Sequence, residues 1–143
     1  MNKDISIIIG SRPQYIKIAP IIYYLKNSKI SYFTIDTSQH YDYELSKIFI
    51  NELKIKKFDF NLNVKSDTHA EMTALMMIKI EKILIRLKPK LILVFGDTNS
   101  TLAASLVASK LRILIAHIEA GMRSFNQIPE DINRVLTDKI SSL

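Results

Sequence analysis

The sequence contains no cysteine, which excludes disulfide bonds and thiolate metal sites. It also has no apolar run approaching the ~20 residues that a membrane span requires. Its first residues lack the long apolar core and small-residue cleavage site of a signal peptide. We therefore expect no membrane partner and, by default, a cytoplasmic location.

Glycine-rich phosphate loops are missing as well. The chain has three glycines, and neither a GxGxxG pattern nor a Walker sequence occurs. Such loops cradle the phosphates of dinucleotides and of ATP, so their absence argues against both ligands. We expect no cofactor.

Runs of like charge are absent, although the net charge is +6. The lysines are scattered singly and lack the aromatic interleaving of nucleic-acid surfaces. An anionic small molecule, or an ordinary solvated surface, explains the basic balance better than nucleic acid does. Salt-sensitive binding of random DNA would favour the nucleic-acid alternative.

Two short apolar runs dominate what is present, at Leu91–Phe95 and at residues 113–116. Each is uniformly apolar and too short for a helix, which is typical of a strand buried on both faces of a parallel sheet. The segment Asn99–Lys110 is long enough to be the crossover helix between them. Asp97 and Glu119 then leave the sheet at its carboxyl edge, where open α/β sheets bind ligands.

The other segments continue the same alternation. We expect strands at Ile5–Ile9, Tyr32–Asp36 and, weakly, residues 58–62. Helical spacing covers residues 13–27, 41–53, 69–88 and 130–143. The 143 residues are therefore predicted to form one α/β domain, residues 1–143, with a Rossmann-like, doubly wound parallel sheet.

Helix signals sharpen some of these boundaries. Pro13 suits a first helical position, whereas Pro20 should kink or restart its helix. Thr68 and Glu71 have the spacing of a capping box, and Pro89 ends the helix that they open. The last segment carries an apolar helical stripe without a C-cap, so the chain looks truncated; the stripe consists of Ile132, Val135, Leu136, Ile140 and Leu143.

Each candidate site residue also has a structural interpretation. The turn at Gly10 could present backbone N–H groups to an anion, with Arg12 as a bidentate partner, or could be a plain strand–helix turn. Asp97 could simply cap the helix that follows it. His117 could be a satisfied core histidine or contact a ligand, while Glu119 needs a partner or a task.

The remaining acidic residues have local explanations. Glu130 and Asp131 would favour the dipole at the start of the last helix, and Arg134 could pair with Glu130 at i,i+4. The spacing of His117, Asp97 and Glu119 matches no standard zinc signature, so no metal site is expected.

Five motifs occur in order along the chain, namely Gly10-Ser11-Arg12-Pro13-Gln14-x-x-Lys17-x-x-Pro20, Ser38-Gln39-His40, Gly96-Asp97-Thr98, His117-x-Glu119-Ala120-Gly121-x-Arg123 and Pro129-Glu130-Asp131-x-Asn133-Arg134. Together they resemble the non-hydrolysing UDP-N-acetylglucosamine 2-epimerases. The likeness covers essentially the whole chain, and the last two motifs are specific. Gln14 and Ser11 stand where that family usually has Glu and Thr.

The resemblance implies the N-terminal domain of a glycosyltransferase-B-like, two-domain fold, with the second, nucleotide-binding domain absent. It implies inversion at C2 of a UDP-hexosamine by elimination and re-addition of UDP, and a homodimer for the full-length form. The acid–base residues would be Asp97, Glu119 and Glu130. The substrate-binding residues would be Arg12, Lys17, Gln39, His40, His117 and Arg123.

Two alternatives follow from the same residues. One is the N-terminal portion of such an epimerase, inactive by itself because the substrate would lie between two domains. The other is a non-catalytic Rossmann-like remnant that binds an anionic nucleotide or a partner protein.

Overall fold

The computed structural model describes residues 3–37, 58–126 and 128–143. Its strands are β1 (Ile5–Ile9), β2 (Tyr32–Asp36), β3 (Phe60–Asn61), β4 (Leu91–Phe95) and β5 (Leu114–Ile118). Its helices are α1 (Arg12–Lys26), α3 (His69–Leu87), α4 (Asn99–Lys110) and α5 (Pro129–Ile140). The helix predicted over residues 41–53 lies outside the described residues.

The strands form one parallel sheet in the order β3-β2-β1-β4-β5. The predicted doubly wound α/β fold is therefore confirmed. The chain moves outward from β1 in one direction and then from β4 in the other. The loops after β1 and β4 consequently lie next to each other at the carboxyl edge.

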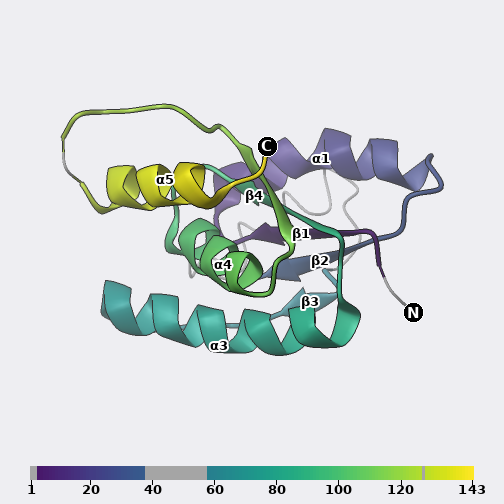
Figure 1. The fold of residues 1–143 in the computed structure, drawn as a ribbon, viewed down its shortest axis with the longest axis horizontal. Coiled ribbons are helices and arrows are strands. Elements are labelled where there is room, and N and C mark those ends of the chain that lie inside the picture. Colours follow the sequence, from purple (N-terminus) through teal and green to yellow (C-terminus); the bar gives the residue numbers. More distant parts are fainter. Residues whose placement is uncertain (1–2, 38–57, 127) are drawn as a thin grey trace.

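Both faces of the sheet are covered by helices (Figure 1), α1 on one side and α3 with α4 on the other. Alternate residues of β1 enter different cores: Ile7 and Ile9 pack with α1, whereas Ile8 packs with α3 and α4. All three are at most 2% exposed. This explains why four of the five residues of β1 are isoleucine, since successive side chains point to opposite and equally buried faces.

α1 continues through Pro20, so the predicted restart of the helix is wrong. Ile18 and Ile22, on either side of the proline, are both buried in the core beneath α1. Burial of side chains this size contributes about 1.5–3 kcal/mol each, which offsets the hydrogen bond that Pro20 cannot make. The Pro20 ring itself is exposed.

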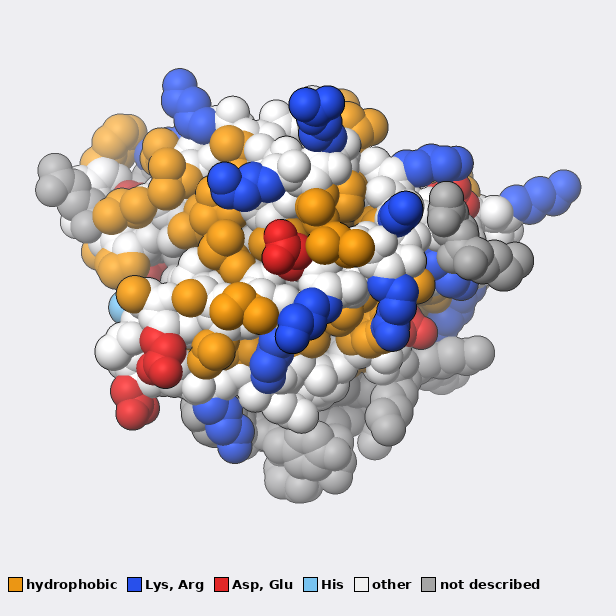
Figure 2. Space-filling model, turned by 60° about the horizontal axis from the view of Figure 1, so that its bottom comes forward, with side chains coloured by type: hydrophobic (Ala, Val, Ile, Leu, Met, Phe, Trp, Pro, Cys, Tyr) orange, Lys and Arg blue, Asp and Glu red, His pale blue; other side chains and the backbone are white. Residues whose placement is uncertain are grey.

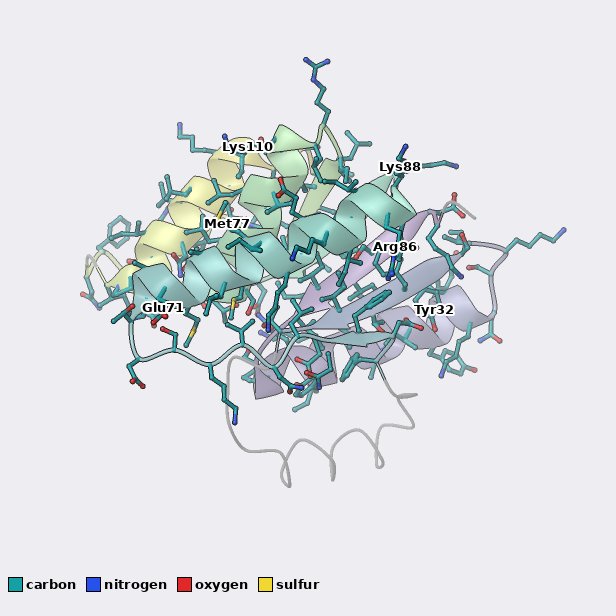
Figure 3. All side chains as sticks on the ribbon, turned by 90° about the horizontal axis from the view of Figure 1, so that it is seen from below. Tyr32, Glu71, Met77, Arg86, Lys88 and Lys110 are labelled. Atoms are coloured by element: carbon teal, nitrogen blue, oxygen red, sulfur yellow. The ribbon has the colours of Figure 1, made fainter. Side chains whose placement is uncertain are left out.

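The predicted capping box at the start of α3 forms only in part. The Thr68 hydroxyl accepts from the Glu71 backbone N–H as expected. The Glu71 carboxylate, however, accepts from the Ser66 hydroxyl at 2.7 Å, and Ser66 Oγ accepts from the Thr68 N–H. Ser66, and not Glu71, is therefore the acceptor for the backbone N–H of the N-cap residue Thr68. Further along α3, the Arg86 guanidinium lies 5.4 Å from the Phe60 ring centroid. Figure 3 labels Arg86 among the side chains of α3.

α5 ends at Ile140, earlier than the predicted stripe, because the last three residues leave the helix. Leu143 lies beside the outer edge of β5, where its N–H donates to the Ile115 carbonyl and its carbonyl accepts from the His117 N–H. Leu143 is therefore not part of the apolar face of α5. None of the helices in the described segments is long and apolar enough to cross a membrane.

Candidate functional site

Asp97 follows directly from the end of β4, through Gly96 with a φ of +66°. Its carboxylate forms an ion pair with the Arg134 guanidinium of α5. The Asn133 side-chain amide donates to the Asp97 carbonyl at 2.9 Å. Two consecutive residues of α5 thus hold both the side chain and the backbone of Asp97.

The local interpretation of Asp97 as a helix cap is wrong. Thr98 is the N-cap of α4, and its hydroxyl accepts from the Thr101 N–H at 3.3 Å. The predicted pairing of Arg134 with Glu130 is also wrong, because the guanidinium turns to Asp97 and lies 3.7 Å from Asp131. The Asp97 carboxylate remains 29% exposed and accessible to a ligand.

Glu119 begins the loop after β5 with a φ of +69°, a backbone conformation that glycine favours and that glutamate rarely adopts. Such strain persists where surrounding contacts fix it. Here the Lys17 ammonium of α1 donates to the Glu119 carboxylate at 2.7 Å. The side chains of Lys17 and Glu119 are 37% and 33% exposed, so solvent reaches the pair.

The loops that carry Asp97 and Glu119 touch each other. A Cβ atom placed on Gly96 would lie 3.2 Å from Glu119 Oε2, so glycine leaves the space that this carboxylate occupies. The two acidic residues are thus brought to one edge of the sheet, as predicted. One is held by a cation from α5 and the other by a cation from α1.

Of the two interpretations of the turn after β1, its hydrogen bonds match the plain strand–helix turn. Gln14 Oε1 accepts from the N–H groups of Gly10 and Ser11, at 2.7 and 3.2 Å. Gln14 Nε2 donates to the Phe95 carbonyl at 2.8 Å. The side chain of Gln14 therefore satisfies two of the N–H groups that an anion would have used. The Arg12 side chain, Gln39 and His40 lie outside the described parts of the structure.

His117 is buried, and both of its ring nitrogens have partners. Nε2 lies 2.6 Å from the Gly96 carbonyl oxygen, and Nδ1 lies 2.7 Å from Asp138 of α5. Of the two alternatives, the satisfied core histidine describes this side chain. Arg123 donates to the same Asp138 carboxylate at 2.7 Å.

Asp138 and Asp131 anchor the loop after β5 to α5. Burial raises the pKa of Asp138, but hydrogen bonds from Arg123, the Gly121 N–H and His117 outweigh it and hold that pKa below its usual value. Hydrogen bonds from Ser124 lower the pKa of Asp131 in the same way. No role was predicted for Asp138 from sequence. The only pattern that could have indicated one is its seven-residue spacing from Asp131, which places both on one face of the helix.

Glu130 is exposed in the first turn of α5. Within residues 3–37, 58–126 and 128–143, no cation pairs with Glu130, whereas Asp97 and Glu119 each have one. No group of three or more possible metal ligands occurs among the same residues.

The sequence matches the UDP-N-acetylglucosamine 2-epimerase family over residues 24–143. It is 52% identical, over 96% of its length, to a UDP-N-acetylglucosamine 2-epimerase of Methanocaldococcus jannaschii, of which it covers 38%. It is 47% identical, over 95% of its length, to a UDP-2,3-diacetamido-2,3-dideoxy-D-glucuronate 2-epimerase of Pseudomonas aeruginosa, of which it covers 39%.

The fold agrees with these relatives. The crystal structure of the Methanocaldococcus jannaschii UDP-GlcNAc 2-epimerase in complex with UDP-GlcNAc and UDP superposes with a TM-score of 0.93. The superposition covers 97% of this chain and 39% of that one, at 52% identity. The chain thus spans about two fifths of these relatives and corresponds to their N-terminal part. Sequence and fold together place it in the UDP-N-acetylglucosamine 2-epimerase family.

Proposed function

We propose that the chain supplies the acid–base wall of a UDP-hexosamine 2-epimerase. The observation that carries this proposal is the arrangement of Asp97 and Glu119. They follow adjacent parallel strands, reach the same edge of the sheet, and remain partly exposed while each is held by a cation.

The reaction requires groups of this kind. A base removes the proton at C2 of the sugar, the bond from C1 to the diphosphate oxygen breaks, and UDP leaves with those electrons. The resulting C1–C2 double bond is then protonated at C2 from the opposite face, and UDP adds again at C1. Positioned acids and bases typically accelerate such steps ~10²–10⁴-fold.

Asp97, Glu119 and Glu130 are the candidates for these proton transfers. Lys17 has two tasks in this scheme, since it orients Glu119 and supplies positive charge for the departing diphosphate. The remaining substrate contacts are assigned to Arg12, Gln39, His40 and Arg123.

The isolated chain should not catalyse the reaction. In the proposed enzyme the substrate lies between this domain and a second, nucleotide-binding domain. A single domain, contacting the substrate from one side only, neither holds it in a near-attack geometry nor excludes water from it. We therefore expect no turnover of UDP-N-acetylglucosamine by the 143-residue chain alone.

We also propose that the full-length enzyme is a homodimer in the cytoplasm. Large apolar side chains are exposed on the two helices that pack against α4, namely Ile78 and Ile85 of α3 and Ile132 of α5, each more than 50% accessible. Figure 2 shows a face of the molecule on which hydrophobic side chains lie among scattered lysines and arginines. A hollow of about 440 Å³, lined by residues of α3 and α5, adds a shape that a second copy could fill.

The test joins this chain to the C-terminal part of the Methanocaldococcus jannaschii relative and follows the manno epimer of UDP-N-acetylglucosamine. Glu119→Gln and Asp97→Asn should each lower kcat ~10²–10⁴-fold while leaving UDP affinity nearly unchanged. The matched control is Asp4→Asn, which removes a carboxylate from an ion pair with Lys90 away from the carboxyl edge.

The outcomes separate the two classes of function. Near-normal turnover in both variants would show that Asp97 and Glu119 are structural. An inactive but folded fusion that still binds UDP would favour the non-catalytic remnant. If UDP-2,3-diacetamido-2,3-dideoxy-D-glucuronate alone is turned over, the enzyme class stands and the sugar changes.

A further inference from the structure

His117 lies at the centre of a series of contacts that runs from β4 to α5. Its side chain has no exposed surface. Nε2 meets the Gly96 carbonyl oxygen at 2.6 Å, and Nδ1 meets Asp138 Oδ1 at 2.7 Å. The other Asp138 oxygen accepts from the Gly121 N–H at 3.1 Å and from Arg123 at 2.7 Å.

The partners of the ring determine where its protons lie. A carbonyl oxygen can only accept, so Nε2 must donate to Gly96. Asp138 accepts two further N–H groups, one of them from the Arg123 guanidinium, and this arrangement favours its ionised form. Nδ1 therefore donates as well.

The charged groups around the ring agree with this assignment. α5 contributes the Asp138 carboxylate, and the loop after β5 contributes Arg123, which faces that carboxylate and lies beyond it from the ring. The loop after β4 presents the Gly96 carbonyl to the ring. The last residues of the chain present the Leu143 backbone to the His117 backbone.

We propose that His117 is a positioning residue that donates from both ring nitrogens and thereby fixes the Gly96–Asp97 peptide against α5. Because a peptide unit is planar, holding the Gly96 carbonyl also sets the direction of the Asp97 N–H and Cα. Arg134, on the same helix as Asp138, then fixes the Asp97 carboxylate. This inference rests on the proposed role of Asp97 in proton transfer.

The arrangement joins the two candidate acid–base loops. His117 lies in β5, two residues before Glu119 in the loop that follows the strand. Its ring contacts the carbonyl of Gly96, the residue before Asp97. A shift of α5 would therefore move both loops together. Preorganised sites generally require residues that do not react themselves but hold the reactive side chains in position.

The first measurement is nitrogen NMR of the histidine rings in the 143-residue chain at pH 7.5. Both ring nitrogens of His117 should have the chemical shifts of protonated nitrogen, with a through-hydrogen-bond coupling from Nε2 to the Gly96 carbonyl carbon. His69 is the internal comparison, because its residue is exposed and its Nδ1 meets a side-chain amide, Asn99, in place of a carboxylate. A neutral His117 ring at this pH would overturn the proposal.

The second measurement separates the two hydrogen bonds. His117→Gln places an amide near the position of Nε2, and His117→Asn places one near the position of Nδ1. The Gln variant should keep the Gly96 carbonyl-carbon and Asp97 amide-nitrogen shifts close to wild type, whereas the Asn variant should move both. The reverse order, or equal changes in both, would indicate a purely structural contact to α5.

Neither measurement depends on catalysis. If the ring results hold but Asp97→Asn leaves turnover intact in the fusion enzyme, the positioning contact stands and the proposed function fails. If a variant does not fold, the ring measurement on the wild-type chain still decides the point.

Discussion

The Lys17 ammonium lies 2.7 Å from the Glu119 carboxylate, although 102 positions separate these residues in the chain. α1 lies on one side of the sheet (Figure 1), and the side chain of its Lys17 reaches the loop after β5. The contact spans β4, which lies between β1 and β5. α1 and the loop after β5 are distant in sequence, yet they bring the Lys17 cation and the candidate base Glu119 together.

Replacing Lys17 should affect catalysis far more than stability. Both partners are about one third exposed, so Lys17→Met should change the free energy of unfolding by at most about 1 kcal/mol. In the fusion enzyme, turnover should fall about 10²-fold, because the leaving diphosphate loses a cation and Glu119 loses its orientation. Lys90→Met, which removes an exposed ion pair with Asp4, is the matched control for both urea unfolding and turnover.

Gln14 should be important for stability. Gln14→Ala should lower the free energy of unfolding by about 2–4 kcal/mol, because it removes the acceptor of two buried N–H groups and the donor to the Phe95 carbonyl. Gln14→Glu retains the acceptor and loses the donor, so its effect should be smaller. Urea denaturation measures both, with Asn27→Ala as an exposed control. Equal stability of the Ala variant and wild type would contradict this account.

Gly10 should tolerate no side chain. A Cβ there would lie 2.0 Å from Ser100 Oγ and 2.2 Å from Thr37 Oγ1, and these two hydroxyls share a 2.6 Å hydrogen bond. Gly10→Ala should therefore cost about 1–3 kcal/mol or more, since three elements must move apart.

Gly121→Ala is the comparison for Gly10→Ala, because nothing lies within 4 Å of its added Cβ, although its φ is +77°. The cost there should be about 1–2 kcal/mol from backbone strain alone. Thermal unfolding of the two variants distinguishes overlap from strain, and a smaller loss for Gly10→Ala would refute the close approach.

Stability should fall in acid partly through Asp4. Hydrogen bonds from Lys90, and then from Ser31, lower the pKa of Asp4 from 3.8 to about 2. A depressed pKa in the folded state gives stability that is present above 3.8 and is lost as the pH falls toward 2. Asp4→Asn and Lys90→Met should both flatten this part of the curve of unfolding midpoint against pH. An unchanged slope in both variants would rule out this ion pair as its source.

The sheet could be predicted from sequence because its strands are short, mainly apolar segments bounded by turns. The bounds of β1, β2, β4 and α4 agree with prediction. Prediction from local sequence failed where two adjacent residues were both suitable for the same structural role, as at the N-cap of α4. Asp97 and Thr98 are both good helix caps, and the choice of Thr98 follows from Arg134, which is distant in sequence.

The same reasoning explains the other errors at the site. Gln14 could be identified as a departure from the family motif, but not as the side chain that fills the turn after β1. Arg134 has an acidic neighbour, Glu130, one helical turn away, but its guanidinium pairs with Asp97 in the loop after β4. Asp138 carried no motif, because its role comes from contact with His117 and Arg123. Tertiary contacts decided each case.

The long separation between Lys17 and Glu119 also sets an order of events during synthesis. Lys17 leaves the ribosome 102 residues before its partner, which takes roughly 5–20 s at ordinary rates of translation. Contacts this distant in sequence form late, after the local pairing of β1 with β2. A nascent chain halted before β5 could therefore build much of its sheet while this part of the candidate site remained open.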